Sequence, residues 1–73
     1  MAASTPRDPA ARVRTLLLRG DNLMKSAHPE RFGRALQAFE QARDVAAEPE
    51  VDARVRELVD RRIESLRGLM AEP

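Results

Sequence analysis

The chain has 73 residues, of which 13 are basic and 12 are acidic, so its formal net charge is only +1. A chain of this length forms one domain, buries only about 60% of its unfolded surface and has little core to spare for an active-site cavity. It contains no cysteine and one histidine, which excludes disulfides and the common zinc sites. The balanced charge gives no argument for a nucleic-acid partner or a membrane surface. Lys25 is the one basic residue that is not arginine, a bias expected of a GC-rich, bacterial genome.

The N-terminal segment predicts a disordered arm over residues 1–8, followed by a helical domain over residues 9–73. Residues 2–7 are small and polar and include a proline. The first nine residues lack the apolar core of a signal peptide, and the longest aliphatic run in the chain is Leu16–Leu18. We therefore expect a cytoplasmic protein without a membrane anchor.

A first helix is predicted over residues 9–27. Asp8 can cap it, and Pro9 suits the first helical position because a missing N–H costs nothing there. At 100° per residue, seven apolar or small residues fall within one arc, which indicates a core face. They are Val13, Leu16, Leu17, Gly20, Leu23, Met24 and Ala27.

A second helix is predicted over residues 29–47, because Pro29 follows His28 and an acid follows in the first turn. Its apolar stripe consists of Phe32, Ala35, Leu36, Phe39, Ala42 and Ala46. Small residues let helix axes approach, and a glycine inside a helix costs about 1 kcal/mol relative to alanine, so it implies a packing reason. We therefore predict that Gly20 of the first helix crosses near Ala35 and Ala42.

A third helix is predicted over residues 49–70, opened by Pro49. Its apolar arc is wide enough to contact both other helices. The arc contains Val51, Val55, Leu58, Val59, Ile63, Leu66, Leu69 and Met70. No sustained alternation of apolar and polar residues predicts a strand. The short connections predict an all-α fold, an antiparallel up-down-up three-helix bundle.

The second predicted helix resembles the second helix of a tetratricopeptide repeat. Ala35, Phe39 and Ala42, followed by Pro49, match the pattern A-x3-F-x2-A followed by proline. Gly20 and Leu23 match the glycine and the large residue of that repeat's first helix. Leu16 stands where the repeat prefers tryptophan and Arg19 where it prefers leucine, and no second repeat follows.

The chain is also similar to a microtubule-interacting-and-transport domain, a three-helix bundle of similar length. Its second helix often reads A-L-x-x-[YF]-x-x-A, here Ala35, Leu36, Phe39 and Ala42, and Arg61, Arg62, Ile63 and Leu66 match its third helix in pattern. Both resemblances imply a module that binds helical or extended peptides of other proteins and has no enzymatic activity.

Four side chains are candidate partner-binding residues: Arg14, Leu18, Lys25 and Arg62. Leu18 lies about 100° from the centre of the first helix's apolar arc, among charged residues, although single exposed leucines are common. Arg62 lies inside the apolar arc of the third helix. If the arc is buried, Arg62 reaches its edge or pairs with an acid such as Asp21, and if the arc lines a groove, Arg62 binds a partner's carboxylate. For Arg43, one turn from Phe39, we predict a cation–π contact within the fold.

The resulting expectation is a small non-enzymatic module that docks a helical or extended segment of another protein beside the first or third helix. We expect no catalytic residue, cofactor or metal, because no acid–base pair, glycine-rich phosphate loop or ligand cluster stands out. One alternative is a self-associating subunit, a homodimer through the third helix. Another is a weak nucleic-acid binder through the basic first helix. The acids interleaved in the third helix disfavour a DNA-recognition role for that helix.

Overall fold

The chain folds into three α-helices in the computed structural model, which describes residues 8–71. They are α1 (Pro9–Lys25), α2 (Arg31–Ala46) and α3 (Ala53–Ala71), and no strand occurs between residues 8 and 71. The predicted all-α three-helix fold is confirmed. The arm predicted over residues 1–8 lies outside the described residues except for Asp8, as do the last two residues of the predicted domain.

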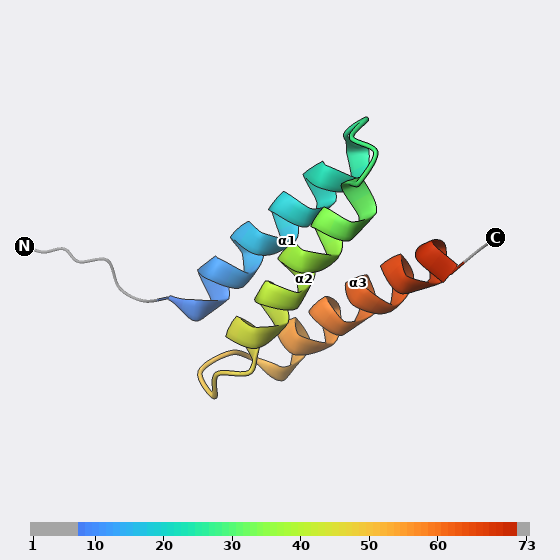
Figure 1. Ribbon diagram of the computed structural model, residues 1–73. Helices are drawn as coiled ribbons and strands as arrows, with labels where there is room; N and C mark the ends of the chain where they lie inside the picture. Colours follow the sequence, from blue (N-terminus) through green and yellow to red (C-terminus); the bar gives the residue numbers. More distant parts are fainter. Residues whose placement is uncertain (1–7, 72–73) are drawn as a thin grey trace, which may run out of the picture.

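Helix α2 is the central element of the fold (Figure 1). Helices α1 and α2 form one packed pair and α2 and α3 form another, whereas contact between α1 and α3 is sparse. The third helix, expected to contact both others, therefore packs against α2 and touches α1 only sparsely. As a consequence, part of the apolar arc of α3 has no helix against it.

Helices α2 and α3 begin later in the sequence than predicted, because Pro29 and Pro49 lie in the turns before them. The first helix ends at Lys25, where the Ser26 hydroxyl donates to the carbonyl oxygen of Leu23 at 2.7 Å. Pro29 lies in the turn that follows, in which His28 Nδ1 accepts from the N–H of Glu30 at 3.0 Å. Helix α2 therefore begins at Arg31 rather than at Pro29.

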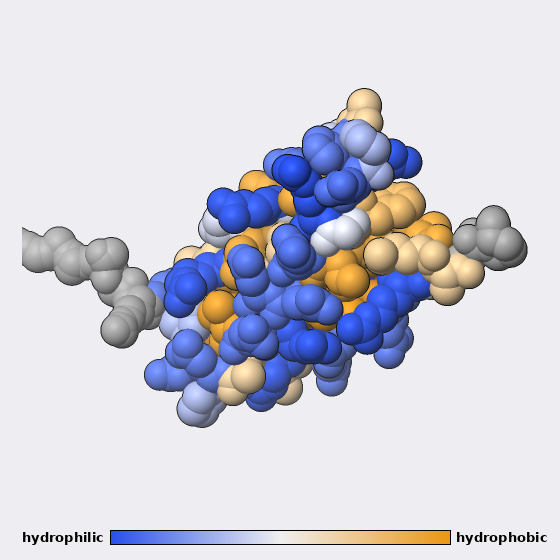
Figure 2. Space-filling model, in the orientation of Figure 1, coloured by the Kyte–Doolittle hydropathy of each residue, from blue (hydrophilic) through white to orange (hydrophobic). Residues whose placement is uncertain are grey.

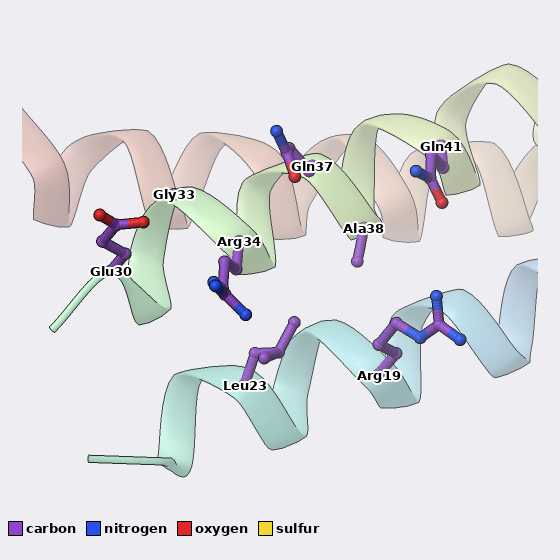
Figure 3. A pocket seen from close by; sticks show the side chains of 8 residues that line it. All are labelled: Arg19, Leu23, Glu30, Gly33, Arg34, Gln37, Ala38 and Gln41. Carbon is purple, nitrogen blue, oxygen red and sulfur yellow. The ribbon is translucent and has the colours of Figure 1, made fainter. Parts of the chain in front are cut away.

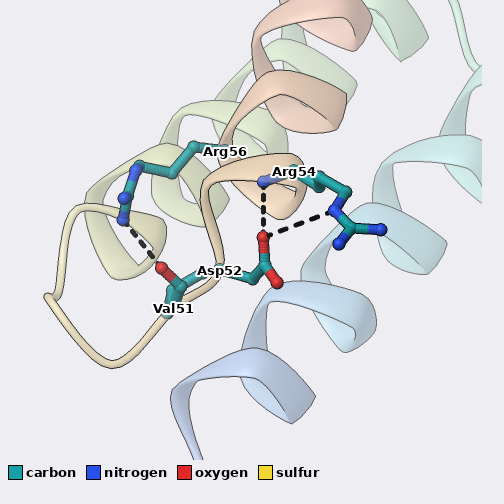
Figure 4. Close-up of polar contacts among 4 residues, drawn as sticks. All are labelled: Val51, Asp52, Arg54 and Arg56. Carbon is teal, nitrogen blue, oxygen red and sulfur yellow. Dashed lines mark hydrogen bonds and ion pairs between the residues drawn. The ribbon is translucent and has the colours of Figure 1, made fainter.

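The start of α3 is set by Asp52 rather than by Pro49. Its carboxylate accepts a hydrogen bond from the N–H of Arg54 at 2.8 Å (Figure 4). Such a side chain satisfies one of the free donors at a helix start, so the helix begins just after it, at Ala53. Pro49 lies in the preceding turn.

We expect Asp52→Ala to lower the free energy of unfolding by about 1 kcal/mol, because the N–H of Arg54 loses its acceptor. Urea unfolding followed by circular dichroism measures the change. Asp52→Asn keeps an acceptor oxygen and is expected to retain most of the stability. An equal loss in both variants would show that the carboxylate charge, and not the cap, stabilises this start.

The core lies along both sides of α2, and Phe39 is its largest fully buried side chain. Gly20 is buried against the Phe39 ring: a Cβ atom on Gly20 would lie 2.7 Å from Cδ1 and 2.8 Å from Cζ. Phe39 stands between Ala35 and Ala42 on α2, and both alanines are fully buried. The prediction that Gly20 packs closely against the second helix is confirmed, with Phe39, which stands between the two alanines, as its contact.

The cation–π contact predicted for Arg43 on Phe39 is wrong. The Phe39 ring is fully buried, and Arg43 is exposed. Instead, the Arg31 guanidinium carbon lies 4.7 Å from the centre of the Phe32 ring. Phe32 is only half-buried near the start of α2, so its ring face is within reach of a neighbouring cation.

Candidate partner-binding cleft

A cleft of about 470 Å³ lies between α1 and α3, where these two helices make little contact. Its lining comes from all three helices and combines large apolar side chains with arginines. The lining residues are Asp21, Met24, Phe39, Leu58, Arg61, Arg62, Ser65 and Leu66. Phe39 and Leu66 belong to the buried core, whereas Leu58 is 42% exposed at the rim. The cleft thus reaches from the solvent to the core.

Arg62 joins the two walls of the cleft. Its Nη2 lies 3.0 Å from Oδ2 of Asp21, so α3 is tied to α1 by an ion pair. The pairing predicted between Arg62 and Asp21 is confirmed. The two side chains are 42% and 31% exposed, and a pair this exposed contributes about 1 kcal/mol or less. The Nε atom of Arg62 is buried and has no hydrogen-bond partner, so the guanidinium uses few of its donors.

Arg61 adds a second positive charge to the cleft. Its side chain is exposed, and none of the ion pairs between residues 8 and 71 includes it. The carboxylate of Asp21 already faces Arg62. The lining therefore holds two cations and one anion, an excess of positive charge beside apolar surface.

The exposed apolar side chains of α3 extend the surface beyond the cleft. Leu69 and Met70 are each 46% exposed, near the end of the helix. Figure 2 shows apolar surface between the α1–α2 pair and the C-terminal part of α3, bordered by hydrophilic residues. Apolar surface with a polar border is typical of a protein-binding site.

A larger groove of about 840 Å³ lies between α1 and α2, on a different set of residues (Figure 3). It is lined by Arg19, Leu23, Glu30, Gly33, Arg34, Gln37, Ala38 and Gln41. Charged and amide side chains dominate this lining, and Leu23 is its one large apolar residue. Because apolar anchors supply most of the binding energy at protein interfaces, the smaller cleft between α1 and α3 is the better candidate site.

The four sequence-predicted residues do not form one site. Arg62 lines the cleft between α1 and α3, whereas Leu18 lies in a hollow on the other side of α1, with Thr15, Arg19, Asn22 and Leu23. Leu18 is 61% exposed, as its wheel position predicts, and Arg14 and Lys25 are exposed on α1.

The sequence analysis placed Met24 and Leu58 in core-facing arcs and did not single out Arg61, so it missed the cleft that these residues share with Arg62. The available signal was the apolar arc of the third helix, which is wider than one neighbouring helix covers.

No match was found for the chain among protein-family models, curated proteins or solved structures. The three-helix fold is compatible with both family resemblances, but no family match confirms either. Between residues 8 and 71, no group of three or more histidine and acidic side chains could hold a metal ion. In the same part of the chain, none of the helices is long and apolar enough to span a membrane.

Proposed function

We propose that the chain is a non-enzymatic protein–protein interaction module that docks a helical or extended segment of a partner between α1 and α3. The observation that carries this proposal is the sparse contact between these two helices. It leaves Met24 and Leu58 beside a hollow that opens to solvent. A partner segment would cover the apolar wall that α1 leaves free, which is the usual way a groove between helices binds a peptide.

The composition of the cleft supports binding through an apolar centre and a charged rim. Leu58, Met24 and Leu66 offer apolar contact, and Arg61 and Arg62 border them. Apolar anchors supply affinity in such sites, and charged groups at the rim orient the partner and accelerate its association. Arginine suits this role because its planar guanidinium can donate several hydrogen bonds at once.

A selection from a random peptide library tests this function. We expect 16-residue peptides to be retained by the wild-type chain and released by Leu58→Glu, which places a carboxylate at the apolar rim. Leu18→Glu is the matched control, since it makes the same change on the other side of α1. Peptides that bind both variants equally, or no specific peptide at all, would contradict docking in this cleft. Circular dichroism would establish that both variants are folded.

Self-association through α3 is a second candidate function, favoured by the exposure of Leu69 and Met70. In this case the α3 surface of one copy would cover that of another. Sedimentation equilibrium of the wild type and of Leu69→Glu measures it. A wild-type dimer that becomes monomeric in the variant supports self-association, and a monomer at about 100 µM contradicts it.

A further inference from the structure

We infer, on the basis of the proposed docking function, that the cleft between α1 and α3 selects an acidic amphipathic segment. Carboxylates of the partner would pair with Arg61 and Arg62, and its apolar side chains would contact Leu58 and Met24. Three features of the molecule point to such a partner: the charge of the cleft, the hydrogen bonding of Arg62 and the pattern of residues along α3.

The charge of the cleft is the first of these observations. Arg61 is exposed and outside the ion pairs found between residues 8 and 71. Asp21 is the only acid among the lining residues, and it is already paired with Arg62. A neutral partner would cover Arg61 without giving it an ion-pair partner. An acidic partner would compensate it, and charge-assisted hydrogen bonds are about twice as strong as neutral ones.

Arg62 is held by fewer hydrogen bonds than its chemistry allows. A guanidinium has five N–H donors, and here Nη2 contacts Asp21 while Nε is buried without an acceptor. Buried donors without a partner are rare in folded proteins and call for an explanation. The side chain is 42% exposed, so it can turn toward the cleft opening and give up little buried contact. An incoming carboxylate would give it the second acceptor that this arrangement lacks.

The pattern along α3 favours an acidic partner over a second copy of the chain. Leu58, Arg62, Ser65 and Leu69 are spaced four, three and four residues apart and therefore share one face. If two copies paired antiparallel along this face, the Arg61 and Arg62 side chains of both would gather at the centre. Like charges that meet at an interface oppose association. An acidic helix with the same apolar spacing removes this repulsion.

The test uses the peptide pool selected on the wild-type chain. We expect Asp and Glu to be enriched in it over the starting library. For the tightest peptide, labelled with a fluorophore, anisotropy titrations compare it with versions in which each carboxylate is replaced by its amide. At least one replacement is expected to weaken binding about tenfold. Raising the salt concentration from 0.05 M to 0.5 M is expected to weaken binding of the acidic peptide more than binding of its amide version.

Variants of the chain locate the carboxylate. Arg61→Gln is expected to weaken binding of the acidic peptide five- to tenfold. Arg62→Lys keeps the charge but lacks the guanidinium, and it is expected to weaken binding a few-fold. Arg19→Gln makes the same charge change in the α1–α2 groove and is expected to leave the affinity within twofold. Because Arg61 is exposed and outside the ion pairs of residues 8–71, its variant tests the inference even if Arg62→Lys disturbs the fold.

The outcomes separate this inference from the docking function. The inference of an acidic partner would be wrong if the peptides that Leu58→Glu releases carry no acid, or if their amide versions bind with the same affinity. The docking function would stand in either case. The absence of any peptide that depends on Leu58 would overturn both. If sedimentation shows a wild-type dimer that Leu58→Glu dissociates, a second copy covers this face and the inference is wrong.

Discussion

Gly20→Ala is expected to lower the free energy of unfolding by about 1–3 kcal/mol, although alanine forms helices better than glycine. The new Cβ atom would lie 2.7 Å from Cδ1 and 2.8 Å from Cζ of Phe39. The ring is fully buried among core side chains, so it can relieve the overlap only if α1, α2 or the neighbouring side chains shift. Alanine gains about 1 kcal/mol in helix propensity, and the forced separation of α1 and α2 costs more than this gain.

The matched control for Gly20→Ala is the same substitution at Gly68. This glycine is exposed within α3, and a Cβ atom there would have no neighbour within 4 Å. We expect Gly68→Ala to raise the free energy of unfolding by up to about 1 kcal/mol, less if the end of the helix frays. Urea unfolding followed by circular dichroism measures both changes. The opposite signs would show that packing, not backbone freedom, requires glycine at position 20.

A double-mutant cycle identifies the Phe39 ring as the cause. Phe39→Leu removes Cε1 and Cζ, two of the three ring atoms nearest to the new methyl group. The cost of Gly20→Ala is therefore expected to fall by at least about 1 kcal/mol, a coupling typical of residues in contact. A cost that stays the same in both backgrounds would contradict the proposed clash and point to a general weakening of the α1–α2 pair.

The contact between Gly20 and Phe39 also shows which part of the fold the sequence predicts well. A glycine in the middle of an apolar arc implies a close neighbour, and alanines at three- and four-residue spacing imply a surface on which that neighbour fits. Three periodic segments with short connections then leave few arrangements open. The number of helices, their antiparallel order and the crossing of the first two could therefore be predicted.

The ends of the helices and the outline of the cleft could not be predicted in the same way. Proline is compatible both with a first helical position and with a turn, and the side-chain acceptor of Asp52 decides between them for α3. A helical wheel shows that Leu58 lies on an apolar face but not which neighbour covers that face. The small amount of contact between α1 and α3 depends on how α3 packs against α2, which the wheel of a single helix does not contain.

Arg56 is the side chain that fixes the turn between α2 and α3, and its role could not be predicted from its place among alternating charges. Its Nη1 atom lies 2.9 Å from the carbonyl oxygen of Val51 (Figure 4) and 3.2 Å from that of Ala46, with Glu48 O at 3.5 Å. Ala46 is the last residue of α2, so its carbonyl has no partner within the helix. Arg56 thus ties the end of α2 and the turn to the first part of α3.

Arg56→Ala is expected to lower the free energy of unfolding by about 1.5–3 kcal/mol. The variant loses hydrogen bonds from a charged donor, and the part-buried carbonyl oxygens of Ala46 and Val51 lose that donor. Arg56→Lys is expected to recover only part of this stability, since an ammonium lacks the planar shape that spans these oxygens. The control is Arg54→Ala, whose side chain is 90% exposed and 3.9 Å from Asp52, with an expected change below about 0.5 kcal/mol. Urea unfolding of the three variants measures these effects.

The Arg56 variants also connect the turn with the cleft. Because α3 contacts α1 sparsely, its position depends on the turn and on its packing against α2. A loosened turn would let α3 shift and would lengthen the distance between Arg62 and Asp21, the pair that joins the two walls. Arg56→Ala is therefore expected to lower the affinity for peptides that dock in the cleft. Anisotropy at a temperature where the variant is fully folded measures this affinity. Unchanged affinity in a destabilised variant would mean that the packing of α2 on α3, rather than the turn, holds the cleft in shape.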